Sequence, residues 1–110
     1  MEKSTEEKIQ QLQMIEQGMQ NFLLQKQQLQ AQLVETDSAL KELETSETAY
    51  KIVGNIMVSA DKEELKKDLQ SKKETVELRI KTLEKQEAQM KEKASSMQSE
   101  VLEKLKQKSD

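Results

Sequence analysis

Apolar residues recur every three or four positions over two long stretches of this chain, and the repeat is interrupted once, near the middle. Such spacing places apolar side chains on one stripe of an α-helix and is typical of coiled coils. The sequence therefore predicts a single domain over residues 1–110, with a helix over residues 4–47, a different element over 49–60 and a second helix over 61–107.

The first predicted helix begins near Ser4, which forms a capping-box pattern with Glu7. Eight of its ten heptad core positions are apolar, and the exceptions are Lys26 and Thr36. Glutamine crowds its surface positions, and a glutamine tract can instead be aggregation-prone low complexity, but the heptad runs through it unbroken. The core positions are Leu12, Met19, Lys26, Leu33 and Leu40 at a, and Ile15, Phe22, Leu29, Thr36 and Leu43 at d.

The second predicted helix begins at Asp61, which can cap it while Glu64 takes the reciprocal position. Its polar core positions are Lys73 and Glu87, and Lys26 and Glu87 lie in adjacent layers where they can pair. Polar core residues usually set register at a cost in stability, and an ion-binding site is the alternative. The positions are Leu69, Val76, Leu83, Met90 and Met97 at d, and Lys73, Ile80, Glu87, Ala94 and Val101 at a.

Residues 49–60 predict a tight β-hairpin. Two runs rich in β-branched residues flank Gly54-Asn55, a two-residue turn signal in which glycine accepts a positive φ. Cross-strand partners then have numbers that sum to 109, and both faces are largely apolar. Because an isolated apolar hairpin with open edges is marginal and prone to aggregate, we expect other subunits to cover it. The expected oligomerisation residues are Tyr50, Ile52, Val53, Gly54, Ile56, Met57 and Val58.

The two heptads follow the same relation. Residues of the two helices whose numbers sum to 109 should lie at the same height, and each a position of the first helix then faces a d position of the second. Leu12 meets Met97 and Leu33 meets Val76. The predicted fold class is therefore mainly α, a long antiparallel two-helix coiled coil joined by one β-hairpin that assembles into an intersubunit β-barrel.

The amino-acid composition argues against several classes of function. The 18 basic and 21 acidic residues are interspersed, which argues against nucleic acid as a partner, and the chain has no histidine and no cysteine. Carboxylate pairs arise by chance on such charged helices, so we expect no enzymatic site, cofactor or metal. No apolar run is long enough for a membrane span, the N-terminus is too polar for a signal peptide, and we expect a cytoplasmic location.

Apolar side chains also lie off the core positions near both chain ends, where they widen the apolar stripe. Methionine and exposed aliphatic residues suit promiscuous contact, so we expect a client-binding surface there. Alternatives are a permanent contact with another helix, as in a structural coiled-coil scaffold with one fixed partner, or decoration of frayed ends. An interfacial membrane helix would need a basic polar face, which the mixed charges do not provide. The expected client-binding residues are Ile9, Leu12, Ile15, Met97, Val101, Leu102 and Leu105.

Three segments resemble the β-type subunit of archaeal prefoldin: Tyr50-Lys-Ile-Val-Gly-Asn-Ile-Met-Val58, Lys62-Glu-Glu-Leu65 and the helix over residues 72–87. The glutamine-rich segment Gln25-Lys-Gln-Gln-Leu29 is similar too. The single hairpin matches the β type, since α-type subunits carry two.

The resemblance implies a hexamer of two α-type and four β-type subunits, with hairpins joined in a double β-barrel and six coiled coils projecting from it. It implies capture of non-native client proteins at the coiled-coil tips, without ATP, and their transfer to a group II chaperonin. We expect chaperonin docking in the polar tail over residues 104–110.

Overall fold

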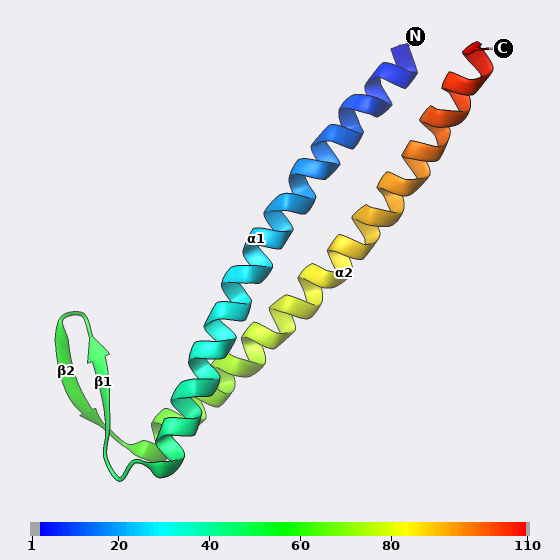
Figure 1. Ribbon diagram of the computed structural model, residues 1–110. Coiled ribbons are helices and arrows are strands. Elements are labelled where there is room, and N and C mark those ends of the chain that lie inside the picture. Colours follow the sequence, from blue (N-terminus) through cyan, green and yellow to red (C-terminus); the bar gives the residue numbers. More distant parts are fainter. Residues whose placement is uncertain (1–2, 110) are drawn as a thin grey trace. The chain divides into compact units, whose positions relative to one another are not determined.

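The computed structural model describes residues 3–109. Helix α1 (Lys3–Thr45) leads through a short connection to strands β1 (Ala49–Val53) and β2 (Ile56–Ala60), and helix α2 (Lys62–Ser109) completes the chain (Figure 1). The predicted mainly-α fold, two long antiparallel helices joined by one hairpin, is confirmed. Helix α1 ends two residues before the predicted position 47, and α2 continues past the predicted position 107.

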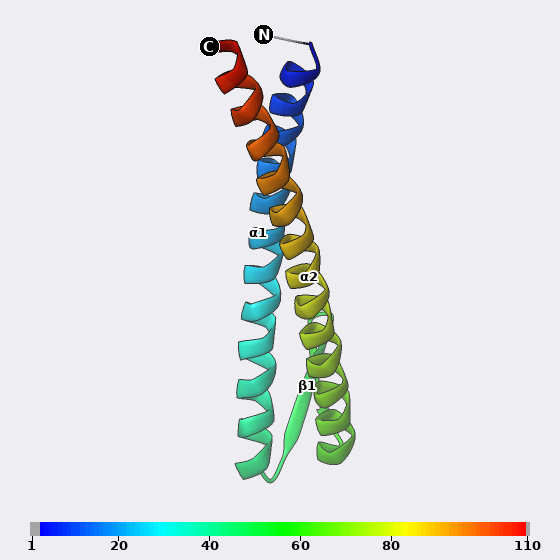
Figure 2. The same cartoon turned by 90° about the vertical axis from the view of Figure 1, so that its right-hand side faces the viewer.

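The chain divides into two compact units. The terminal unit contains the described residues up to Lys26 and those from Thr82 onward, and the hairpin unit contains Gln27–Lys81. In each unit a stretch of α1 lies beside a stretch of α2 that runs in the opposite direction (Figures 1 and 2). Each unit therefore has its own part of the apolar stripe formed by the a and d positions of both helices, which we call the seam.

The seam forms where the heptads predict it. All twenty assigned a and d positions are buried or half-buried. In the terminal unit the buried apolar residues are Ile15, Met97 and Val101, and in the hairpin unit they include Val76 and Ile80. Burial at heptad spacing removes one stripe of each helix from water, and this is the main stabilising contribution available to a chain with so few aromatic residues.

Contacts between the helices also follow the predicted register. In the terminal unit, Lys8 pairs with Glu100, and the added Cβ of a residue at position 18 would lie 3.2 Å from Met90 Cε. In the hairpin unit, Lys73 pairs with Asp37. The numbers in these pairs sum to 108 or 110, next to the predicted 109. The register read from the turn is therefore kept within both units.

The two predicted helix starts have different outcomes. Asp61 caps α2 as predicted, because its Oδ1 accepts a hydrogen bond from Glu63 N at 3.0 Å. Helix α1 includes Lys3, one residue before the predicted start near Ser4, so Ser4 lies within the helix. The Ser4 hydroxyl instead accepts a hydrogen bond from Lys104 Nζ at 3.1 Å and so links the two helices of the terminal unit.

The hairpin has the predicted register. Val53 pairs with Ile56, Ile52 with Met57, and the ladder continues to Ala49 and Ala60. Gly54 has a φ of +62°, which is the left-handed conformation that its place in the turn requires. The prediction of a two-residue turn at Gly54-Asn55 is confirmed.

Candidate interaction surfaces

The hairpin exposes most of its apolar side chains. Ile52 is 72% exposed and Met57 66%, and Tyr50, Val53 and Ile56 are all more than half exposed. Only Val58 among the predicted oligomerisation side chains is half-buried. These residues form what we call the hairpin surface. A cluster of exposed β-branched, aromatic and methionine side chains on a short strand pair is typical of a binding surface.

The hairpin also leaves backbone groups unpaired. Over residues 3–109 the sheet consists of β1 and β2 alone, so the outer edge of each strand has no neighbouring strand. Unpaired N–H and C=O groups on a strand edge favour pairing with another strand. The hairpin surface therefore offers both an apolar face and hydrogen-bonding edges to a partner.

The predicted client-binding residues fall into two groups. Ile15, Met97 and Val101 are buried in the seam of the terminal unit, and Ile9 and Leu12 are half-buried. The buried group is held between the helices, so it stabilises the coiled coil.

Leu102 and Leu105 are exposed, at 65% and 39%. Met14, an off-seam residue that the sequence analysis did not assign to the client-binding set, is 70% exposed. We call Leu102, Leu105 and Met14 the terminal surface, because all three belong to the unit that holds both chain ends. The heptad positions of these residues are the signal that finds the terminal surface. The positions c of Met14 and b of Leu102 face away from a two-helix seam, and the position e of Leu105 flanks it.

Other exposed apolar residues are scattered. Leu23 and Leu24 lie in the terminal unit, and Val34 lies in the hairpin unit. Single exposed aliphatic residues are normal on protein surfaces and indicate no site by themselves.

Ion pairs join the helices of the terminal unit. Lys8 Nζ lies 2.6 Å from Glu100 Oε2, and the hydrogen bond and charge of Lys8 lower the pKa of Glu100. Deeper in the same unit, Lys26 and Glu87 pair across the seam, and this confirms the predicted pairing of these two polar core residues. These two ion pairs hold the helices in register within the terminal unit.

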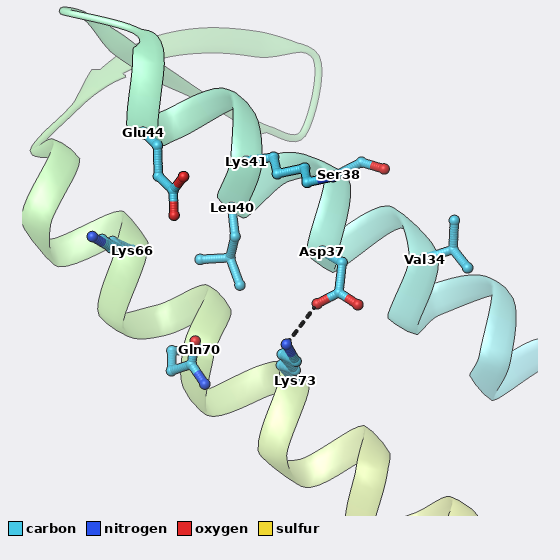
Figure 3. A pocket seen from close by; sticks show the side chains of 9 residues that line it. All are labelled: Val34, Asp37, Ser38, Leu40, Lys41, Glu44, Lys66, Gln70 and Lys73. Carbon is cyan, nitrogen blue, oxygen red and sulfur yellow. Dashed lines mark ion pairs between the residues drawn. The ribbon is translucent and has the colours of Figure 1, made fainter.

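The hairpin unit contains an open cavity of about 510 Å³ between α1 and α2. In Figure 3, Asp37 and Lys73 point toward one another across it, and Lys73 Nζ lies 2.9 Å from Asp37 Oδ1. The hydrogen bond that Lys73 donates to Asp37, together with the negative charge of Asp37, raises the pKa of Lys73 above its ordinary value of 10.5. A general base or nucleophile needs a pKa nearer neutrality, so this pair is suited to bridging the helices rather than to proton transfer.

The described residues offer neither a metal-ligand cluster nor a membrane-spanning helix. Between positions 3 and 109, no three His, Cys, Asp or Glu side chains are grouped so that they could hold a metal ion. Over the same span, neither helix is both long enough and apolar enough to cross a membrane.

The chain was compared with known proteins. The family described as "Prefoldin subunit" matches residues 6–108. Prefoldin subunit beta of Archaeoglobus fulgidus is 44% identical over 94 residues, which cover 83% of this chain and 81% of that protein. Prefoldin subunit beta of Sulfurisphaera tokodaii is 36% identical over 97 residues, covering 86% and 78%.

A solved structure agrees with these sequence matches. The crystal structure of the prefoldin beta subunit from Thermococcus strain KS-1 has a TM-score of 0.87 and 31% sequence identity, and the match covers 94% of each chain. The similarity extends over the hairpin and both helices, and the resemblance stated from the sequence is confirmed.

Proposed function

This chain belongs to the prefoldin subunit family, a family of chaperone subunits, and we propose that it works as an ATP-independent holdase. In this proposal the subunit captures non-native proteins in the cytoplasm and delivers them to a group II chaperonin. The observation that carries the proposal is the exposure of Leu102 and Leu105 beside a seam that already buries Ile15, Met97 and Val101.

The assembly that we propose contains two α-type and four β-type subunits, with the hairpins joined in a double β-barrel. The exposed side chains of Tyr50, Ile52, Val53, Ile56 and Met57 support it, as do the open edges of β1 and β2. A hairpin alone is marginally stable in water, and closing several hairpins into a barrel removes their edges. The hairpin surface is therefore the proposed assembly element.

Client capture in this proposal depends on weak apolar contacts. Burying one leucine side chain contributes about 1.5–3 kcal/mol, so one subunit with two or three exposed residues holds a client loosely. Several subunits acting together raise the affinity without any new kind of contact. Release then needs no bound nucleotide, because each contact is reversible on its own. Ile9 and Leu12, which are half-buried, extend the proposed contact area beside the exposed leucines.

The proposal is tested with matched leucine and valine variants. The change Leu102→Ser with Leu105→Ser removes two of the three apolar side chains of the terminal surface, those contributed by α2. The control Val34→Ser removes an equally exposed side chain, 66% against 65% for Leu102, from the hairpin unit. Each variant is assembled with an α-type subunit, and the aggregation of a chemically denatured client is followed by light scattering.

We expect the leucine variant to lose most of the protection and the Val34 variant to keep it. If the leucine variant protects the client as well as the unaltered chain does, the proposed client surface is wrong. A separate binding measurement with a group II chaperonin tests delivery, and the polar tail from Lys104 onward is the segment to delete in that experiment.

A further inference from the structure

The two faces of the hairpin differ in composition. The strand register places Tyr50, Ile52, Met57 and Ser59 on one face, which we call the tyrosine face. The opposite face carries Lys51 and Val58 at its centre, and we call it the lysine face; its members are Ala49, Lys51, Val53, Ile56, Val58 and Ala60. The tyrosine face has no charged residue, whereas the lysine face has an ammonium group in the middle of its strand.

The lysine face is turned partly toward its own chain. Ala49 is buried, at 8% exposed, and Val58 and Ala60 are half-buried. Lys51 lines a hollow of about 130 Å³ together with Glu64 and Asp68 from the first turns of α2. The carboxylates of Glu64 and Asp68 and the ammonium group of Lys51 line the same hollow of the hairpin unit, and opposite charges at short range attract one another.

The tyrosine face has less of this cover, since Ser59 alone among its residues lines that hollow. All four of its residues are exposed, and Ile52, at 72%, is the most exposed large apolar residue described in the chain. Toward the base of the hairpin the exposed fraction on this face falls only to 57%, at Tyr50, whereas on the lysine face it falls to 8%, at Ala49. The hairpin unit therefore covers the base of the lysine face, while Val53 and Ile56 near the turn and the side chains of the tyrosine face stay exposed.

We propose that the tyrosine face alone forms the core between subunits, and that it packs there against the tyrosine face of a second copy of this chain. This inference rests on the proposed hairpin-driven assembly and says which side chains it buries. In a closed barrel alternate residues of each strand point inward and fill the interior, so only one face of the hairpin can be inside. Placing the lysine face inside would bury an ammonium group away from Glu64 and Asp68, and burying a charge without a partner is unfavourable.

A second copy suits this face in chemistry and in geometry. Two uncharged apolar faces can pack about 10 Å apart, as stacked sheets do, and the open edges of β1 and β2 can pair with further strands at the same time. The Tyr50 hydroxyl and the Ser59 hydroxyl can reach partners at the end of the face nearest the helices. The lysine face meanwhile stays outside and keeps its contacts with α2.

The test uses neighbouring residues that point to opposite faces. Ile52→Lys and Met57→Lys place a charge on the tyrosine face, and Val53→Lys and Ile56→Lys place the same charge one position away on the lysine face. All four residues are between 58% and 72% exposed in the isolated chain, so none of the changes should unfold the helices. Helical content is checked by circular dichroism, and the mass of each variant mixed with an α-type subunit is measured by light scattering after size exclusion.

We expect Ile52→Lys and Met57→Lys to weaken assembly at least tenfold, and Val53→Lys and Ile56→Lys to keep the full mass. If the lysine-face variants dissociate and the tyrosine-face variants do not, or if all four dissociate, the face assignment is overturned while hairpin-driven assembly stands. If all four keep the full mass, hairpin-driven assembly itself fails.

A separate experiment tests whether the partner of the tyrosine face is a second copy of this chain. Tyr50 is the only tyrosine and the chain has no tryptophan, so its fluorescence reports on the tyrosine face alone. Acrylamide quenching of the unmixed chain is measured over a dilution series. We expect quenching to decrease severalfold as concentration rises, and to stay high at all concentrations in Met57→Lys. Quenching that is the same at every concentration in the unaltered chain would exclude a second copy as the occupant.

Discussion

The ammonium group of Lys26 lies 3.6 Å from Glu87 Oε2, across the seam of the terminal unit, and the two side chains are only 20% and 26% exposed. An ion pair that is largely removed from water gains Coulomb energy but loses hydration, so its net contribution is small while the loss of one partner is costly. This pair interrupts the seam of the terminal unit, which is otherwise apolar. Substitutions at these two positions should therefore change the free energy of unfolding of the chain.

Removing one member of this pair should destabilise the terminal unit. We expect Glu87→Ala to lower the free energy of unfolding by about 1–2 kcal/mol, because it leaves the Lys26 ammonium group half-buried without its carboxylate. The double change Lys26→Leu with Glu87→Leu should restore stability or raise it by about 1 kcal/mol. Urea unfolding followed by circular dichroism measures both. A double variant less stable than Glu87→Ala would contradict this account.

Replacing each of the two glycines by alanine should change the stability of the chain in opposite directions. Gly54 has a φ of +62° and open space around its missing Cβ, so Gly54→Ala adds backbone strain of about 1–2 kcal/mol and little else. Gly18 lies inside α1, where alanine improves helix propensity by about 1 kcal/mol. Its new Cβ would lie 3.2 Å from Met90 Cε, the flexible end of a side chain that can move.

We therefore expect Gly18→Ala to raise the thermal midpoint and Gly54→Ala to lower it or to weaken assembly. Thermal unfolding curves of the two variants, compared with that of the unaltered chain, test both predictions. A lowered midpoint for Gly18→Ala would mean that Met90 cannot give way.

Thr36 should be replaceable by valine. It occupies a seam position, is 3% exposed, and donates a hydrogen bond from Oγ1 to the Gln32 carbonyl oxygen at 2.8 Å. That bond is local to α1 and makes no link to α2, and such bonds slightly disfavour helices. We expect Thr36→Val to change the free energy of unfolding by less than about 1 kcal/mol in either direction, whereas Thr36→Asp should cost about 3 kcal/mol or more by burying a charge. Denaturant midpoints of the two variants provide the comparison.

Acid should weaken the contacts of the terminal unit. Lys8 lowers the pKa of Glu100 in the folded chain relative to its ordinary value of 4.5, so the folded state holds this proton less tightly than the unfolded state does. The stabilisation is therefore complete above pH 4.5 and is lost as the pH falls through the lower, folded pKa. Unfolding midpoints of the unaltered chain and of Glu100→Gln, measured from pH 7 to pH 2, should converge at the acid end. A constant gap between them would mean that the pair does not contribute.

The sequence predicted the regular parts of this structure because they follow from two short-range rules. Gly54-Asn55 marks a two-residue turn, and that turn assigns partners to every strand residue from Ala49 to Ala60. The heptads then assign the seam, and they place its polar members Lys26 and Glu87 in adjacent layers, where the two side chains pair. Turn chemistry and apolar periodicity agree here, so neither helix could slide past the other without exposing its seam.

The sequence was less informative where competing contacts decide the outcome. Ser4 has the composition of a helix cap, yet its hydroxyl is taken by Lys104 from the other helix, a tertiary contact that no local pattern contains. Likewise, the predicted client-binding set mixed two roles. The heptad already separates them, since Val101 takes the core position a and Leu102 the outer position b, and the structure buries Val101 and exposes Leu102 accordingly.

The shared register has a consequence for how this kind of chain can change in length. A residue added to α1 moves every later seam side chain by about 100° around the helix, and it also shifts the partners that face it in α2. The seam keeps its geometry when seven residues enter α1 and seven enter α2 at the matching height, which lengthens each helix by about 10 Å, whereas insertions of three or four residues locally unwind or overwind the helices. Duplication or deletion of coupled heptads therefore changes the length of both helices while the seam and the turn at Gly54 stay as they are.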